Sequence, residues 1–136
     1  RRIMTPENKA TWIEALRSGK YKQGAYALHQ SDRFCCLGVA IEVLTDLEWE
    51  DCDDPSDFED RKQVKGFEEI LYGGSLPGDV AERLGFDDIV PWDVVLKFCQ
   101  DVNSLDEWTW EDLATYLNDC GQYTFSGIAD VMEKYM

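Results

Sequence analysis

The sequence predicts a mainly α-helical protein, α+β at most, built around one buried helix over residues 34–47. Within that range only positions 38, 42, 45 and 46 are not apolar, so apolar groups surround the helix, as is typical of one in the middle of a domain. Ser31 or Asp32 is predicted to cap it. Residues 1–136 are expected to form a single domain of six or seven helices, with a small β-hairpin or turn near 20–33.

Residues that start and stop helices delimit the other predicted elements. Thr5 is expected to cap the first helix, with Pro6 at its first position and Gly19 after its end. A capping box of Ser56 and Glu59 predicts a helix that buries Val64 and Phe67. Further helices are predicted to start near Pro77, Pro91, Thr109 and Thr124.

Composition points to a folded intracellular protein. The chain is 44% hydrophobic and 12% aromatic, which excludes a wholly disordered chain. Its five cysteines are an odd number, and the adjacent pair Cys35 and Cys36 falls in a predicted core helix, so reduced thiols in a cytoplasm are expected. No signal peptide is recognised, and no apolar run approaches the roughly 20 residues that span a bilayer.

Charge is distributed unevenly along the chain. Residues 1–33 include seven basic and three acidic residues, which gives a local charge of +4. Because the net charge of the chain is −15, the remaining residues carry a charge of −19. A strongly negative protein repels the phosphates of duplex DNA, so direct DNA binding is not expected. A small anion near the basic segment is compatible with this distribution.

Three short motifs resemble a family of small proteins of tailed bacteriophages and prophages. They are Tyr21-Lys22-Gln23-Gly24, Cys35-Cys36-Leu37-Gly38-Val39 and Asn118-Asp119-Cys120-Gly121. The resemblance assigns no catalytic residues. It implies an accessory protein acting in the cytoplasm of the bacterial host, where modulation of host enzymes or of host defence is a common role.

The basic turn after the first helix is the leading candidate site. Its lysines and arginines offer donors to phosphate oxygens, and its tyrosine offers a ring for stacking on a base. The hypothesis is a non-enzymatic protein that sequesters a small anionic, nucleotide-like ligand, alone or as a homo-oligomer. The candidate ligand-binding residues are Arg17, Lys20, Tyr21, Lys22, Gln23 and Arg33. The same residues would otherwise only solvate an exposed turn.

The acidic segment at 46–60 supports a second hypothesis. Nine of its fifteen residues are acidic, which favours an exposed loop. Such a loop could act as a decoy or inhibitor by presenting carboxylates to a basic surface of a host protein. The candidate partner-binding residues are Asp51, Asp53, Asp54 and Asp57.

A thiol enzyme is the third hypothesis. If Cys35 or Cys36 lay in the first turn of the central helix, the positive helix end would lower its pKa and favour the thiolate. His29, the only histidine, would have to supply the base. The alternative is that both cysteines are small buried hydrophobes. No metal site or cofactor motif is recognised, so a binding role is favoured over catalysis.

Overall fold

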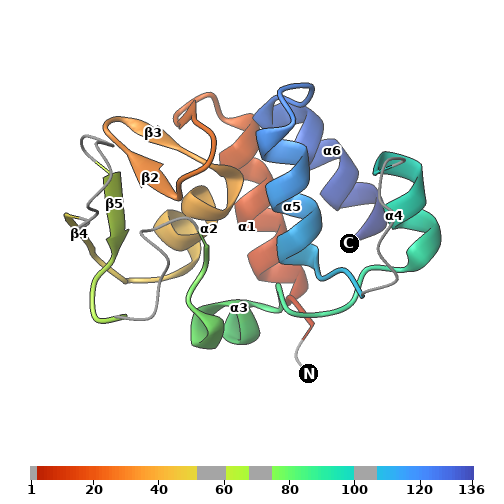
Figure 1. Ribbon diagram of the computed structural model, residues 1–136, viewed down its shortest axis with the longest axis horizontal. Coiled ribbons are helices and arrows are strands. Elements are labelled where there is room, and N and C mark those ends of the chain that lie inside the picture. The colour runs from red at the N-terminus through yellow and green to blue at the C-terminus, as the bar shows by residue number, and fades with distance from the viewer. Residues whose placement is uncertain (1–2, 52–60, 68–74, 100–106) are drawn as a thin grey trace.

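The computed structural model describes residues 3–51, 61–67, 75–99 and 107–136. Over these residues the chain forms helices and one five-stranded sheet (Figure 1). The helices are α1 (Pro6–Arg17), α2 (Cys36–Leu44), α3 (Gly78–Leu84), α4 (Trp92–Phe98), α5 (Trp110–Asp119) and α6 (Phe125–Tyr135). The strands are β1 (Lys22–Gln23), β2 (His29–Gln30), β3 (Arg33–Phe34), β4 (Trp49–Asp51) and β5 (Arg61–Val64).

The prediction of a mainly α fold with only a small hairpin is wrong, because the protein has a mixed sheet of order β1-β3-β2-β5-β4. Strands β1 and β3 are parallel, and the other pairs are antiparallel. The helix predicted from Ser56 is replaced over 61–64 by β5, which pairs with both β2 and β4. Strands of two to four residues are too short to show alternation, so their pairing depends on distant neighbours.

The central helix α2 is shorter than the predicted 34–47. It is capped by Cys35, whose Sγ accepts a hydrogen bond from the backbone N–H of Gly38 at 3.4 Å, and not by Ser31 or Asp32. Ser31 and Asp32 instead form the turn between β2 and β3. Residues 36–41 are all buried, and Figure 1 shows α2 between the sheet and the helices α1 and α5.

Most of the predicted helix boundaries are confirmed. The Thr5 side chain accepts from the N–H of Asn8, and Thr109 forms a capping box with Asp112. Thr124 likewise accepts from the N–H of Gly127 at the start of α6. Local hydrogen-bond chemistry therefore sets these helix ends.

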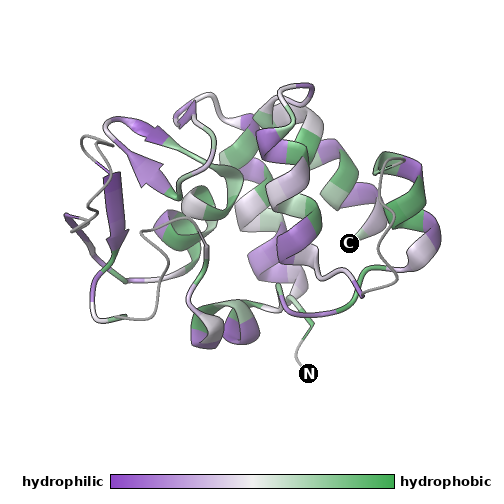
Figure 2. Cartoon of the chain, viewed as in Figure 1, coloured by the Kyte–Doolittle hydropathy of each residue, from purple (hydrophilic) through white to green (hydrophobic). Residues whose placement is uncertain are grey.

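One hydrophobic cluster joins the helices to the sheet. Trp12 of α1 is fully buried, its Nε1–H donates to the carbonyl of Cys36 at 2.9 Å, and its ring meets that of Phe86 edge-on at 5.1 Å. Hydrophilic residues dominate the sheet, and hydrophobic residues dominate the inner helix faces (Figure 2). Among the described residues no helix is both long and apolar enough to cross a membrane.

Gly38 marks the closest approach of α2 to the sheet. A Cβ at this position would lie 1.8 Å from the carbonyl oxygen of Leu28 and 2.8 Å from its carbon. Backbone atoms of a fully buried residue cannot yield as a flexible side chain would. Only glycine therefore allows the start of α2 to contact the segment that leads into β2.

We predict that Gly38→Ala destabilises the protein by about 3 kcal/mol or more, because the added methyl group overpacks a backbone contact. Urea unfolding followed by circular dichroism measures the change. Gly78→Ala is the matched control, since a Cβ there meets nothing within 4 Å, and it should leave stability equal or slightly higher. Equal stability of the Gly38→Ala variant and the wild type would contradict the packing described.

Candidate anion-binding site

Asn118 of α5 brings the three sequence motifs together. Its Oδ1 accepts from the backbone N–H of Cys36 at 3.1 Å and from Nε2 of Gln23 at 3.3 Å. Its Nδ2 donates to the carbonyl of Gly24 at 2.8 Å and to Oδ1 of Asp119 at 3.0 Å. The amide thus uses its two donors and two acceptor positions while only 3% exposed.

The turn that follows β1 is also fixed by hydrogen bonds to the end of α5 and to the segment after it. Gln23 also donates through Nε2 to the carbonyl of Tyr123 at 3.0 Å. Tyr26 has a positive φ of 65°, and Asp119 accepts hydrogen bonds from both its backbone N–H and its side-chain hydroxyl. The Tyr26 N–H donates to Asp119 Oδ1 at 3.1 Å, and its hydroxyl donates to the Asp119 carbonyl at 3.3 Å. This agrees with a structural role for Asn118 and Asp119, which hold the turn in one conformation.

The outer face of the sheet carries a row of polar and basic residues in register, which we call the basic row: Lys22, Arg33, Gln30 and Arg61. Lys22 is paired with Arg33, Arg33 with Gln30, and Gln30 with Arg61. Because side chains alternate along a strand, these four share one face. His29 and Phe34 lie on the opposite face, where their rings stack at 4.1 Å.

Two hollows adjoin this row and share one wall, formed by Gly24, Ala25 and Arg33. The first hollow, of about 390 Å³, is completed by Ala27, Gln30 and Ser31. The second, of about 440 Å³, lies toward the turn between α5 and α6 and is completed by Gln23, Asn118, Gly121, Gln122, Tyr123 and Thr124. A Cβ on Gly24 would come within 3.0 Å of the Arg33 Cβ, so glycine leaves room for the arginine stem.

Among the predicted cationic ligand residues, Arg33 lines both hollows. Its Nη1 donates to the carbonyl of Gln23 at 3.3 Å, and it forms no ion pair with a carboxylate among the described residues. Lys22, by contrast, pairs with Asp32 at 2.7 Å and holds the pKa of that carboxyl below its ordinary value. Arg33 can therefore offer guanidinium N–H groups to an anion.

Lys20 and Tyr21 lie beside the sheet but line neither hollow. The Lys20 ammonium lies 5.8 Å from the centre of the Tyr21 ring. That ring in turn packs edge-on against Phe34 at 5.5 Å. Tyr21 is thus part of the aromatic packing, and its ring is less available for stacking on a base than the sequence suggested.

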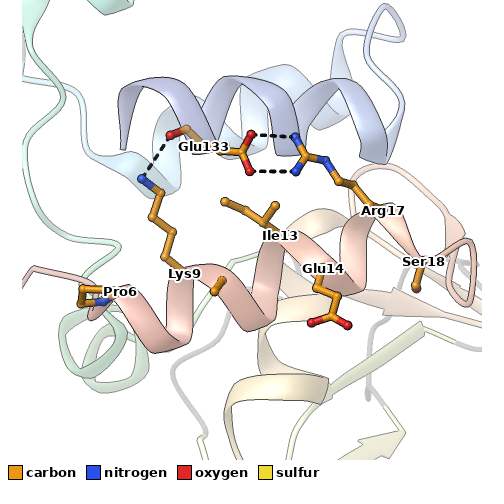
Figure 3. A pocket seen from close by; sticks show the side chains of 8 residues that line it. Pro6, Lys9, Ile13, Glu14, Arg17, Ser18 and Glu133 are labelled. Carbon is orange, nitrogen blue, oxygen red and sulfur yellow. Dashed lines mark hydrogen bonds and ion pairs between the residues drawn. The ribbon is translucent and has the colours of Figure 1, made fainter.

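Arg17 belongs to a different surface. Its guanidinium joins α1 to α6 through Asp130 at 2.6 Å and Glu133 at 2.8 Å, contacts that raise its pKa. It lines a third hollow, of about 630 Å³, together with Lys9, Ile13, Glu14 and Glu133 (Figure 3). Two cations and two carboxylates balance there, so this hollow does not favour an anion. The sequence grouped Arg17 with the turn because the two are close along the chain.

Burial disfavours the thiolate form of both candidate cysteines. Desolvation raises the pKa of Cys35 to about 12 and that of Cys36 well above its ordinary value, so the predicted lowering at the helix start is wrong. Cys36 Sγ donates to the carbonyl of Ala114 at 3.5 Å. His29 is engaged elsewhere, with Nδ1 3.0 Å from the Arg33 carbonyl oxygen and its ring on Phe34. This arrangement is that of core cysteines.

The acidic segment is described only in part. Asp51 lies exposed on β4 and forms an ion pair with Lys62 of β5. Residues 49–51 are thus a strand, although the sequence predicted an exposed loop over 46–60. Asp53, Asp54 and Asp57 lie outside the described residues. In the part of the chain that the structure describes, no cluster of three or more His, Cys, Asp or Glu is placed to hold a metal ion.

Sequence reasoning missed much of this candidate site. Gln30 and Arg61 come from segments assigned to a turn and to a helix, and only strand pairing aligns them with Arg33. Gln122 and Tyr123 are about ninety positions away along the chain. Their one detectable signal was the Asn-Asp-x-Gly motif, which ends just before them.

We predict that Asn118→Ala destabilises the protein by about 2–4 kcal/mol, because it leaves the buried Cys36 N–H and the partly buried Gly24 carbonyl without their partner. Denaturant unfolding measures the loss. Asn8→Ala removes the same amide group from α1 and should change stability by about 0.5 kcal/mol or less. Similar stabilities of the two variants would contradict the role assigned to Asn118.

Thiol labelling with iodoacetamide tests the state of the cysteines. At pH 7 the folded protein should be modified at Cys120, which is partly exposed, well before Cys35 or Cys36, which are buried. Peptide mapping by mass spectrometry assigns each modified residue. In denaturant all three should react at similar rates. Fast labelling of Cys35 in the folded protein would revive the thiol-enzyme hypothesis.

Nearly the whole chain matches a known protein family. Residues 4–136 match a protein family described as a domain of unknown function (DUF8296). No curated protein and no solved structure matches the chain.

Proposed function

We propose that this chain, which belongs to the DUF8296 family because the match covers residues 4–136, binds a small anionic ligand on the outer face of its sheet. One observation supports the proposal above the others. Arg33 lies on the wall common to two hollows and carries a guanidinium without a carboxylate partner among the described residues. In a protein of net charge −15, such a position favours an anion as the bound group.

The neighbours of Arg33 support the same ligand chemistry. Lys22 lies on the adjacent strand and Arg61 two strands away, on the same face. Adjacent strands are about 4.8 Å apart, so the basic row spans roughly 14 Å. Within it Lys22 is paired with Asp32, and Arg61 donates to the carbonyl of Tyr26, so these two cations add positive potential around Arg33. Arginine binds carboxylates and phosphates in a bidentate manner, so either group fits Arg33, and a phosphate-bearing ligand is the one that we propose.

The size of the hollows and the charge of the protein favour a small ligand over a nucleic acid. Both hollows fall within the range of about 300–1,000 Å³ that is usual for small-molecule sites. Long nucleic acids would meet the repulsion of the remaining negative surface.

The biological setting that we propose follows from the sequence resemblance. A phage accessory protein that sequesters a nucleotide-like molecule in the host cytoplasm would lower its free concentration and so blunt a host-defence response. No catalytic group is needed for that role. The buried thiols at Cys35 and Cys36 agree with it.

Charge reversal tests the proposal. After incubation with a bacterial cytoplasmic extract and gentle desalting, native mass spectrometry of the wild type should show a discrete small-molecule mass, which identifies the ligand. Arg33→Glu should bind that ligand at least about tenfold more weakly, because it removes a charged hydrogen bond and adds repulsion. The double variant with Lys22→Glu should bind it no better.

The matched control is Arg83→Glu on α3, which changes the net charge equally but lies outside both hollows. It should bind the ligand with wild-type affinity. Circular dichroism establishes that each variant is folded. Equal ligand binding by folded Arg33→Glu and Arg83→Glu would rule out the proposed site.

A further inference from the structure

We infer that the ligand has two parts, an anionic group held at Arg33 and a hydrogen-bonding ring such as a nucleobase held in the second hollow beside Gln122. This inference rests on the proposed function and assigns a different task to each hollow. The second hollow lies between the sheet edge and the turn that joins α5 to α6.

The two hollows are continuous with each other. The two hollows share the wall formed by Gly24, Ala25 and Arg33, so a molecule in contact with Arg33 reaches both. A single inorganic anion fills neither a space of about 390 Å³ nor one of about 440 Å³, since a water-sized group takes only about 30 Å³. A ligand of nucleotide size can bind Arg33 through its anionic group while the rest of the molecule occupies one of the hollows.

The polar groups that line the second hollow favour an uncharged ring. Apart from Arg33, its polar lining is neutral and consists of amides and hydroxyls, namely Gln23, Asn118, Gln122, Tyr123 and Thr124. Such groups suit the edge of an uncharged heterocycle, which presents both donors and acceptors, better than a second phosphate.

The polar side chains of the second hollow differ in whether they already form hydrogen bonds within the protein. The amides of Gln23 and Asn118 are hydrogen-bonded to each other and to the chain, and Thr124 Oγ1 accepts from the Gly127 N–H. Gln122 is exposed, and its side chain makes no hydrogen bond with the described residues. Its amide can therefore donate to and accept from a base edge, as glutamine does in other recognition sites.

The walls of the second hollow are held in place by hydrogen bonds before any ligand binds. The carbonyl of Gly24 on the shared wall is held by Asn118, and the carbonyl of Tyr123 on the far wall is held by Gln23. The second hollow is thus bounded by two segments that are hydrogen-bonded to the same pair of side chains. A ligand that enters it needs to order little of the protein, which favours affinity.

Isothermal titration calorimetry with two kinds of probe tests the inference on the full chain. The probes are inorganic pyrophosphate, which has no ring, and ADP, GDP, CDP and UDP measured one at a time. Gln122→Ala should weaken at least one nucleoside diphosphate by about threefold to tenfold, the effect of one lost neutral hydrogen bond. It should leave pyrophosphate affinity within about twofold of wild type.

The control variants separate this inference from the proposed function. Arg33→Ala should weaken pyrophosphate and nucleotides alike, and Asn8→Ala on α1 should weaken neither. If Gln122→Ala weakens both kinds of probe equally, or weakens neither, the inference is wrong. The proposed function still stands in that case, provided that Arg33→Ala weakens pyrophosphate binding. Undiminished pyrophosphate binding by Arg33→Ala would overturn both. If the wild type binds none of these probes at millimolar concentration, the inference is wrong, and the native mass spectrum decides on the proposed function.

Discussion

The amide of Asn118 is the interaction on which the arrangement of this protein depends. It joins the start of α2, the turn after β1 and the end of α5 through four hydrogen bonds in a buried position. Without it, the buried N–H of Cys36 and the partly buried carbonyl of Gly24 would lack a partner, and loss of the partner of a buried group costs on the order of 1–3 kcal/mol. The sheet, the central helix and the walls of both hollows therefore share one polar anchor within an otherwise apolar core.

Local signals in the sequence were sufficient for the helices and insufficient for the sheet. Thr5, Thr109 and Thr124 cap helices through groups three residues away, so their signatures are readable in isolation. The Ser56 capping box was read in the same way, yet Arg61–Val64 is a strand because β2 and β4 pair with it. Strand partners separated by 11 to 33 residues leave no periodic trace in segments this short.

The candidate site shows the same division. Gln23 and Arg33 were predicted from local charge and lie together, whereas Arg17 pairs with α6 and Lys20 lines neither hollow. Gln30, Arg61 and Gln122 join them only through the fold. A helix end next to Cys35 suggested an activated thiol, but desolvation by the surrounding core dominates, because burial penalises a thiolate more than a single helix end stabilises it.

The turn after β1 is held mainly from within, and this has an evolutionary consequence. Asn118 and Asp119 fix it through backbone atoms of Gly24 and Tyr26 and through the Tyr26 hydroxyl, not through the side chains of the basic row. Positions such as 22, 30 and 33 can therefore change identity without loss of the scaffold. Such separation of framework from recognition allows one architecture to acquire new binding specificities through a few surface substitutions.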